Sequence, residues 1–215
     1  MPLALRIKAS PSYRTFKAQF WDDNPLFRQI LGVCSALAVT NLVRNTLVMC
    51  AAVTLVTACS SCLYALIRNA TPARTRLLVQ MLIIASLVIV VHLFLGAYMF
   101  AVSEQIGAYV GLIITNCMVL GRVEAFATKN GPWLSFVDGF AAGCGYSLVL
   151  LLVSLPREIL GFGSLCGLAA VPESMPRWNI MVMAPAGFFG LAVVIWVCRG
   201  LQLRAQASKA RPGGK

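Results

Sequence analysis

The sequence predicts an all-α membrane protein with six transmembrane segments arranged as two inverted three-helix repeats. Three observations indicate this fold class. The 215 residues are 59% hydrophobic and only 12% charged, and the mean hydropathy is +0.81, which leaves too little polar surface for a soluble domain. The apolar residues form six runs, of which the first and fourth are the shortest. The basic residues gather at the ends of these runs, as they do in membrane proteins.

One domain, predicted to cover residues 24–199, contains all six runs. Residues 1–23 are basic and have no apolar core, so we interpret them as a cytoplasmic segment and not as a secretory signal peptide. Residues 200–215 form a basic cytoplasmic tail that we expect to be disordered. The net charge of +11 does not indicate nucleic acid binding, because no stacking aromatic residues are interleaved with the basic ones.

Four of the runs are close to the length of about 20 residues that crosses a bilayer. They are predicted as full spans at residues 46–67, 77–102, 137–155 and 180–197.

The first and fourth segments are predicted to be half-helices. Residues 31–39 lead into a polar stretch, 40–45, and residues 109–120 lead into Gly121 and Arg122. Twelve helical residues reach only about 18 Å, so irregular backbone must cover the remaining distance across the membrane. Such backbone is stable only where protein or water covers it.

The six segments divide into three plus three, with a broken helix at the start of each half. The predicted repeats cover about residues 24–102 and 107–199. An odd number of crossings in each half inverts the second half in the membrane. In transport proteins with this pattern, the functional site lies where the broken helices meet.

The distribution of Lys and Arg predicts the orientation. With both termini on one side, that side carries 15 of the 18 basic residues, and the other side carries only Arg44, Arg157 and Arg177. Loops rich in Lys and Arg stay in the cytoplasm. Both termini are therefore expected to be cytoplasmic.

Two of the eight cysteines, Cys34 and Cys117, lie inside the two short segments. Soft thiolates hold iron–sulfur clusters, which usually take four of them, so one interpretation is that these two are half of a cluster site. The alternative is that both are small buried residues at helix breaks. Cys166 alone lies in a loop, so the cysteines do not form a secreted disulfide framework.

Small residues inside the full spans are interpreted as packing surfaces. Cys59 and Cys62 form a C-x-x-C pair on one face of a helix, but that helix is unbroken and no other ligand lies nearby in the sequence. Gly139 and Gly143 form a small-xxx-small face that is typical of helix contacts in membranes. The same interpretation applies to the remaining span cysteines, Cys50, Cys144 and Cys198.

Charged and polar residues at membrane depth are candidates for function. Asp138 opens the fifth segment and could attract Na⁺, or it could act as a helix N-cap at the membrane interface. Glu124 follows the fourth segment and is expected to pair with Arg122. His92 lies deep in the third segment, where a neutral histidine hydrogen-bonded inside the bundle is expected.

Two longer motifs resemble a known family. Residues 31–40 read Leu-Gly-Val-Cys-Ser-Ala-Leu-Ala-Val-Thr, and residues 110–117 read Val-Gly-Leu-Ile-Ile-Thr-Asn-Cys, with Gly-Arg at 121–122 and Glu-Ala-Phe-Ala at 124–127. They resemble the D-type subunits of the sodium-translocating NADH:quinone reductases, from about residue 24 to the sixth segment. The E-type subunits of the Rnf ferredoxin:NAD reductases share the second motif but tend to have proline where this chain has Ser35. We therefore favour the quinone reductases.

The resemblance implies that Cys34 and Cys117 provide two ligands of a [2Fe–2S] cluster near the bilayer midplane. A homologous, oppositely oriented E-type subunit of the same complex would provide the other two. Electrons would pass from an NADH-oxidising flavin and iron–sulfur subunit toward a flavin that is covalently bound in another subunit. FAD, FMN, riboflavin and ubiquinone would bind only in other subunits of the complex, which would lie in the bacterial inner membrane.

The resemblance also implies that Asp138 matches an acidic position associated with sodium uptake. A carboxylate is expected at the place of His92, so its replacement argues against a cation role there. Two other classes of function remain: a secondary transporter with inverted repeats, and a structural partner needed only for assembly. Iron content separates the first interpretation from both alternatives.

Overall fold

The computed structural model describes residues 30–72, 74–98, 111–161, 164–165, 168–169 and 183–209. Its α-helices are α4 (Val33–Val39), α5 (Val43–Ile67), α6 (Arg76–Tyr98), α8 (Cys117–Arg122), α9 (Pro132–Gly161) and α10 (Ala184–Lys209). A π-helix, η2 (Val123–Ala127), continues α8, and two-residue strands β1 (Ser164–Leu165) and β2 (Leu168–Ala169) pair antiparallel.

Three described helices are long and apolar enough to cross a membrane: Val43–Ile67, Arg76–Ala97 and Pro132–Gly161. The 25 residues of the first extend about 38 Å, which exceeds the bilayer core of about 30 Å. A shorter apolar stretch, Pro185–Leu201, lies in α10.

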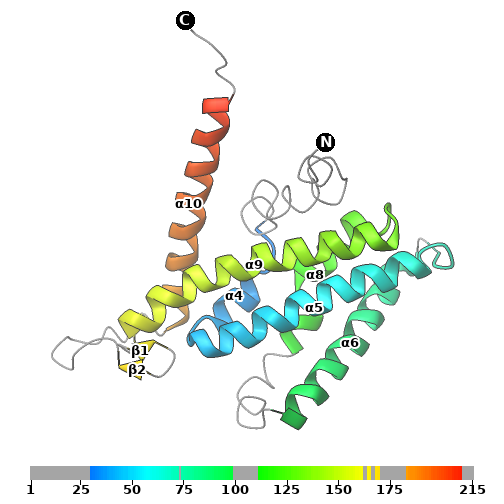
Figure 1. Cartoon of the computed structure of the whole chain (residues 1–215), viewed down its shortest axis with the longest axis horizontal. Helices are drawn as coiled ribbons and strands as arrows, with labels where there is room; N and C mark the ends of the chain where they lie inside the picture. The colour runs from blue at the N-terminus through cyan, green and yellow to red at the C-terminus, as the bar shows by residue number, and fades with distance from the viewer. Residues whose placement is uncertain are drawn as a thin grey trace, which may run out of the picture.

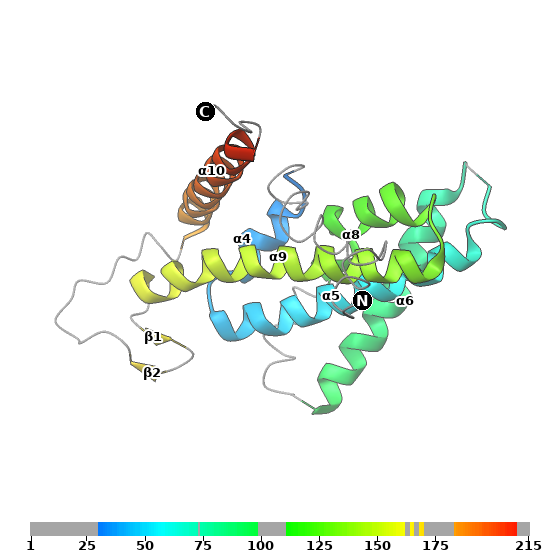
Figure 2. The ribbon, with the colours of Figure 1, turned by 45° about the horizontal axis from the view of Figure 1, so that its top comes forward.

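Helices α5 and α9 form the central pair of the fold and run antiparallel side by side (Figures 1 and 2). Glycines make their close approach possible. A Cβ atom on Gly139 would lie 2.8 Å from the Thr57 carbonyl oxygen, and one on Gly143 would lie 2.8 Å from the Thr54 Cα atom. The predicted packing surface of Gly139 and Gly143 is confirmed.

Helices α6 and α10 contribute less to the core. α6 extends below α5 from the end at which α5 finishes, and α10 leans away from the α5–α9 pair (Figures 1 and 2). Both expose large apolar side chains, which suits a lipid or protein environment. These include Leu78, Leu82, Val90 and Leu93 on α6, and Phe188, Phe189, Val193 and Trp196 on α10.

All four predicted full spans are helical where the structure describes them, three of them are long and apolar enough to cross a membrane, and several boundaries differ from the prediction. The fifth segment is longer than predicted, since α9 begins at Pro132 and ends at Gly161. The sixth continues to Lys209 as α10, so the expectation of disorder from residue 200 is wrong for residues 200–209. Residues 99–102 and 180–182 of the predicted spans lie outside the described residues.

The two predicted half-helices are both interrupted, but at different places relative to their cysteines. The first matches the expectation, because α4 ends at Val39 and α5 begins at Val43. The second does not: residues 111–114 are helical, the break falls at Thr115 and Asn116, and the chain then continues as α8 and η2 through Gly121. The predicted break after residue 120 is therefore wrong.

Candidate functional site

Cys34 and Cys117 lie at the tips of two short helices that touch. Cys34 is in the first turn of α4, and Cys117 is the first residue of α8. The Gly32 N–H, two residues before Cys34, donates a hydrogen bond of 3.0 Å to Cys117 Sγ. Among the described cysteines these two are exposed, whereas the other five are buried or partly buried: Cys50, Cys59, Cys62, Cys144 and Cys198.

Gly32 shapes the tip of α4. Its φ is +84°, in the left-handed region, and it occupies the N-cap position of the helix without a side-chain cap. Left-handed backbone is costly for residues with a Cβ atom. A Cβ atom at this position would also lie 2.8 Å from the ring of Tyr146. Glycine is therefore required for both reasons.

Asn116 shapes the tip of α8. Its side-chain Oδ1 accepts the Met118 N–H at 3.0 Å, so it caps the helix that begins with Cys117. Its Nδ2 donates to Ser35 Oγ at 3.1 Å. One fully buried side chain thus starts the second helix and binds the first.

Tyr146 of α9 lies under both tips. Its hydroxyl is 2.7 Å from the Gly32 carbonyl oxygen, to which it donates, and 2.6 Å from Ser35 Oγ. Ser35 Oγ also contacts the Gly32 carbonyl, at 3.1 Å. The tyrosine side chain is fully buried, where a phenol requires such partners.

The far end of α9 holds the break between α4 and α5. The Glu158 carboxylate accepts the Val43 N–H at 2.5 Å and so caps the start of α5. Arg157 donates to Thr40 Oγ1 at 2.6 Å and to the Leu37 carbonyl at 3.4 Å. The Val43 N–H and the Leu37 carbonyl beside the break therefore have hydrogen-bond partners within the protein, as a membrane interior requires.

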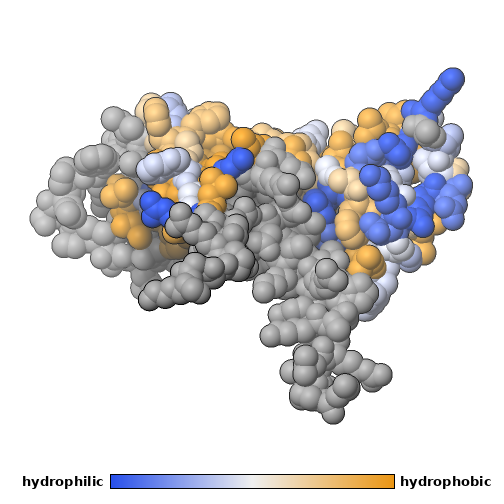
Figure 3. All heavy atoms as spheres, turned by 90° about the horizontal axis from the view of Figure 1, so that it is seen from above, coloured by the Kyte–Doolittle hydropathy of each residue, from blue (hydrophilic) through white to orange (hydrophobic). Residues whose placement is uncertain are grey.

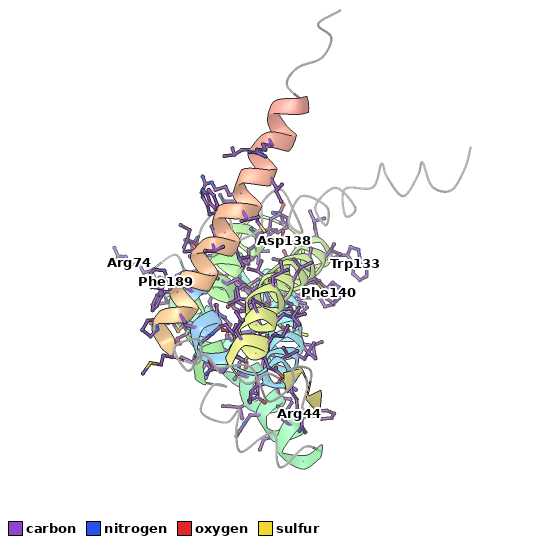
Figure 4. All side chains as sticks on the ribbon, turned by 90° about the vertical axis from the view of Figure 1, so that its left-hand side faces the viewer. Arg44, Arg74, Trp133, Asp138, Phe140 and Phe189 are labelled. Atoms are coloured by element: carbon purple, nitrogen blue, oxygen red, sulfur yellow. The ribbon has the colours of Figure 1, made fainter. Side chains whose placement is uncertain are left out.

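Asp138 is 1% exposed and forms a bidentate ion pair with Arg122, which is 5% exposed. Arg122 Nη2 lies 2.5 and 2.6 Å from the two carboxylate oxygens, and Nε lies 3.1 Å from Oδ2. The guanidinium also stands 5.7 Å above the Phe126 ring of η2. Asp138 lies inside α9, among the helices, whereas Trp133 and Phe140 point outward from α9 (Figure 4).

Two expectations about these charges are wrong. Asp138 is not an N-cap, because α9 begins at Pro132. Arg122 does not pair with Glu124, because packing of α8 against α9 places Asp138 in its reach. Glu124 instead forms an ion pair with Arg76 and accepts from Gln80 Nε2 at 2.7 Å.

Hydrophilic residues gather at one end of the molecule, where α5 and α6 meet the start of α9 (Figure 3). Arg68 Nη1 donates there to the Asn130 carbonyl at 2.6 Å. The exposed residues of this end include Asn69, Arg74 and Lys129. It is the end that the charge distribution predicts to be cytoplasmic.

Three of the remaining candidates, His92, Cys59 and Cys62, lie in the spanning helices α6 and α5. His92 Nδ1 is buried without a hydrogen-bond partner among the described residues, so the expected bond inside the bundle is not found there. Cys59 and Cys62 lie on unbroken α5, and their role in packing stays a prediction. Cys166 lies outside the described residues.

The two helix tips fit half of an iron–sulfur site. Both thiols are exposed, and Cys117 Sγ already accepts a backbone N–H, the kind of contact that stabilises a thiolate ligand. No group of three or more metal-ligating side chains occurs within the described residues. Among the described residues, this place therefore offers two thiols.

Sequence reasoning found the two cysteines but missed the residues that position them. Asn116 before Cys117 carried a usable signal, since asparagine is a favoured N-cap. The left-handed Gly32 and the buried Tyr146 carried none, because their roles depend on contacts between segments more than 100 residues apart.

Comparison with known proteins identifies the family of the chain. Residues 12–195 match the family model of the Rnf-Nqr subunit, a membrane protein. The chain is 50% identical over 185 residues to the D-type subunit of the Na(+)-translocating NADH-quinone reductase of Psychromonas ingrahamii, covering 84% of this chain and 88% of that one. It is 48% identical over 195 residues to the corresponding subunit of Yersinia enterocolitica, covering 88% and 93%. The chain therefore belongs to the Rnf-Nqr family of membrane subunits, and within it to the D-type group that the sequence motifs indicate.

Proposed function

We propose that this chain is a membrane redox subunit of a Na⁺-translocating NADH:ubiquinone reductase and that Cys34 and Cys117 bind a [2Fe–2S] centre. The observation that carries the proposal is that two exposed thiols lie on adjoining helix tips, which are linked by the hydrogen bond from the Gly32 N–H to Cys117 Sγ. A [2Fe–2S] centre supplies one-electron transfer. The chain's own residues hold the thiols in place and keep the surrounding backbone satisfied.

The centre is shared with a second subunit in this proposal. Two thiols leave half of the usual four ligand positions open, and both thiols are exposed. A homologous E-type subunit in the opposite orientation would present a similar pair of tips. The six-segment inverted repeat, with broken first and fourth segments, explains why two such chains would be complementary. The interrupted helices before α5 and at α8 support it.

The electrons begin on NADH and end on ubiquinone. NADH gives up two electrons and one proton and becomes NAD⁺. The quinone takes two electrons and two protons, one of them net from the solution, to become the quinol. The NADH-oxidising subunit, the subunits that carry FAD, FMN and riboflavin, and the quinone site lie elsewhere in the complex. This chain passes the electrons singly between them across the membrane.

The proposed location is the bacterial inner membrane with both termini in the cytoplasm. Arg122 and Arg157, which the charge distribution assigns to opposite loops, are buried, so each side loses one charge and the asymmetry persists. Reporter fusions that work only in the cytoplasm should be active at Lys215 and near Thr75 and inactive near Pro172. The reverse pattern would contradict this orientation.

Asp138 belongs to the sodium path in this proposal, acting through its ion pair. Both carboxylate oxygens are occupied by Arg122, so a cation that reaches Asp138 competes with the guanidinium. Carboxylate oxygens are suitable ligands for a hard cation, and release of Arg122 would couple ion entry to movement of α8.

The test of the thiol assignment is a set of serine variants in the purified complex. Cys34→Ser and Cys117→Ser should each abolish the cluster's EPR signal and quinone reduction, because serine is a poor substitute for a thiolate ligand. The double variant Cys59→Ser, Cys62→Ser is the matched control and should keep both. Loss of iron in the control together with retention in Cys34→Ser would overturn the assignment.

A further inference from the structure

We propose that Tyr146 is a positioning residue that fixes the two cysteine-bearing helix tips relative to each other. The inference rests on the proposed function, because it concerns the same two thiols. Tyr146 belongs to α9, which is a different element from those that carry Cys34 and Cys117. Its hydroxyl bonds to Gly32 and Ser35 of the α4 tip. These are the same two residues that bond to Cys117 and Asn116 of the α8 tip.

The contacts with α4 form a closed triangle. Tyr146 OH, Ser35 Oγ and the Gly32 carbonyl oxygen lie 2.6, 2.7 and 3.1 Å apart in pairs. The only protons available for these three contacts are those of the Tyr146 and Ser35 hydroxyls, since the Gly32 carbonyl can only accept a hydrogen bond. Removal of either hydroxyl therefore leaves the Gly32 carbonyl with a single donor from this triangle.

Two hydrogen bonds then extend from the triangle to the tip of α8. The N–H of Gly32 donates to Cys117 Sγ, and Asn116 Nδ2 donates to Ser35 Oγ. The Gly32 N–H and carbonyl flank the same Cα atom, so a partner that fixes the carbonyl also restrains the direction of the N–H. Tyr146 thereby controls both links between the tips through Gly32 and Ser35.

The tyrosine ring reinforces this control. It occupies the space beside Gly32 where a Cβ atom would lie, at 2.8 Å, and it is fully buried. Water cannot replace the hydroxyl there without displacing packed atoms. The Gly32 backbone is thus held by packing on one side and by a hydrogen bond on the other.

A hydrogen bond to a ligand sulfur also affects redox chemistry. It stabilises the more negative, reduced state and is one of the factors that set the reduction potential of iron–sulfur sites. Loosening of Gly32 should weaken this bond. Loss of the Tyr146 hydroxyl should therefore favour the oxidised state.

The experiment compares Tyr146→Phe and Ser35→Ala with Tyr64→Phe in the purified complex. Tyr64 is an equally buried tyrosine that packs with Val123 and Ala127, away from the tips. Hydrogen–deuterium exchange of residues 31–39 is measured after iron depletion, and a redox titration followed by EPR is made on the iron-loaded complex. The first readout requires no cluster.

Exchange should be about fivefold faster in Tyr146→Phe and in Ser35→Ala, the effect of one hydrogen bond of ordinary strength. The ratio of oxidised to reduced centre at fixed potential should rise by a similar factor, with iron content retained, and Tyr64→Phe should change neither. Parental exchange and parental potential in Tyr146→Phe would overturn the proposal, whatever the result for Ser35→Ala. Should Tyr146→Phe fail to assemble, parental exchange and parental potential in Ser35→Ala, which removes the other hydroxyl of the triangle, would overturn it.

A different result would contradict the proposed function without contradicting the role of Tyr146. If Cys34→Ser retains its iron, the thiols are not ligands, whatever Tyr146 does. In that case faster exchange in Tyr146→Phe still supports the positioning of the tips, and unchanged exchange overturns it.

Discussion

The two broken helices place a cysteine at a helix tip by different means. At α4 the tip depends on backbone freedom, since Gly32 has a φ of +84° and no side chain caps the helix. At α8 the tip depends on a side chain, since Asn116 caps the helix in ordinary extended backbone. The same result, an exposed thiol in the first turn, therefore tolerates different substitutions in the two halves.

Different charged side chains also stabilise the chain at the two helix breaks. Arg157 and Glu158, from the end of α9, hold the gap between α4 and α5. Arg122 and Asp138 instead bind α8 to the first part of α9. Since α9 supplies partners to both, it acts as the common scaffold, and the comparison can be tested by removing one partner at a time.

The largest effect is expected from Asp138→Asn. Arg122 would become a buried charge without its partner, which costs about 3–5 kcal/mol, and the midpoint of thermal unfolding of the complex should fall sharply. The double variant Arg122→Met, Asp138→Leu removes both charges and should recover most of the stability. A single variant as stable as the parent would show that the pair does not secure α8.

The same double variant tests the sodium path. It should keep iron and assemble, but it should need more Na⁺ for half-maximal turnover, because the carboxylate is gone. An assembled complex with a parental sodium titration would leave Asp138 without a role in ion uptake.

Gly32→Ala should have the next largest effect. The left-handed backbone costs about 1–2 kcal/mol, and the clash with Tyr146 adds about 1–3 kcal/mol. Yield of assembled complex and iron content should both drop. Gly111→Ala is the control, because its added Cβ would meet no atom of another segment within 4 Å among the described residues. Equal tolerance of the two variants would contradict the role of backbone freedom at α4.

Thr40→Val should be milder. It removes the hydroxyl that accepts from Arg157 at 2.6 Å and donates to the Ala36 carbonyl at 2.6 Å. Hydrogen bonds to charged groups contribute about 1.5–3 kcal/mol, so unfolding of the complex should begin at lower temperature. The exposed Thr75 provides the control variant Thr75→Val. An unchanged melting curve for Thr40→Val would show that the hydrogen bond from Arg157 to Thr40 does not stabilise the break between α4 and α5.

Asn116→Ala should have the smallest effect on stability, about 1 kcal/mol for a lost N-cap. Asn116→Ser retains a capping oxygen and should recover part of that loss, as measured by the thermal midpoint. Glycine at 32 has no such substitute. If Asn116→Ser were as damaging as Gly32→Ala, the proposed difference between the two tips would be wrong.

The predictable part of this molecule is what local sequence encodes. The lengths of the apolar runs predict the three spanning helices, and the polar stretch after residue 39 predicts the break between the first and second segments. The predicted second break is misplaced, because the apolar run alone indicates one helix, whereas the capping side chain of Asn116 starts a new one within it. The Arg122–Asp138 pair could not be predicted from separation in the sequence, since it depends on how α8 packs against α9.

The most direct test of the shared iron site compares this full chain purified alone with the chain co-purified with its neighbouring subunits. Iron, acid-labile sulfide and EPR are measured on both samples. We expect a [2Fe–2S] signal only in the co-purified sample, with the chain alone colourless, because two thiols leave the cluster half coordinated. A stable isolated chain with a full iron–sulfur spectrum would contradict the shared site.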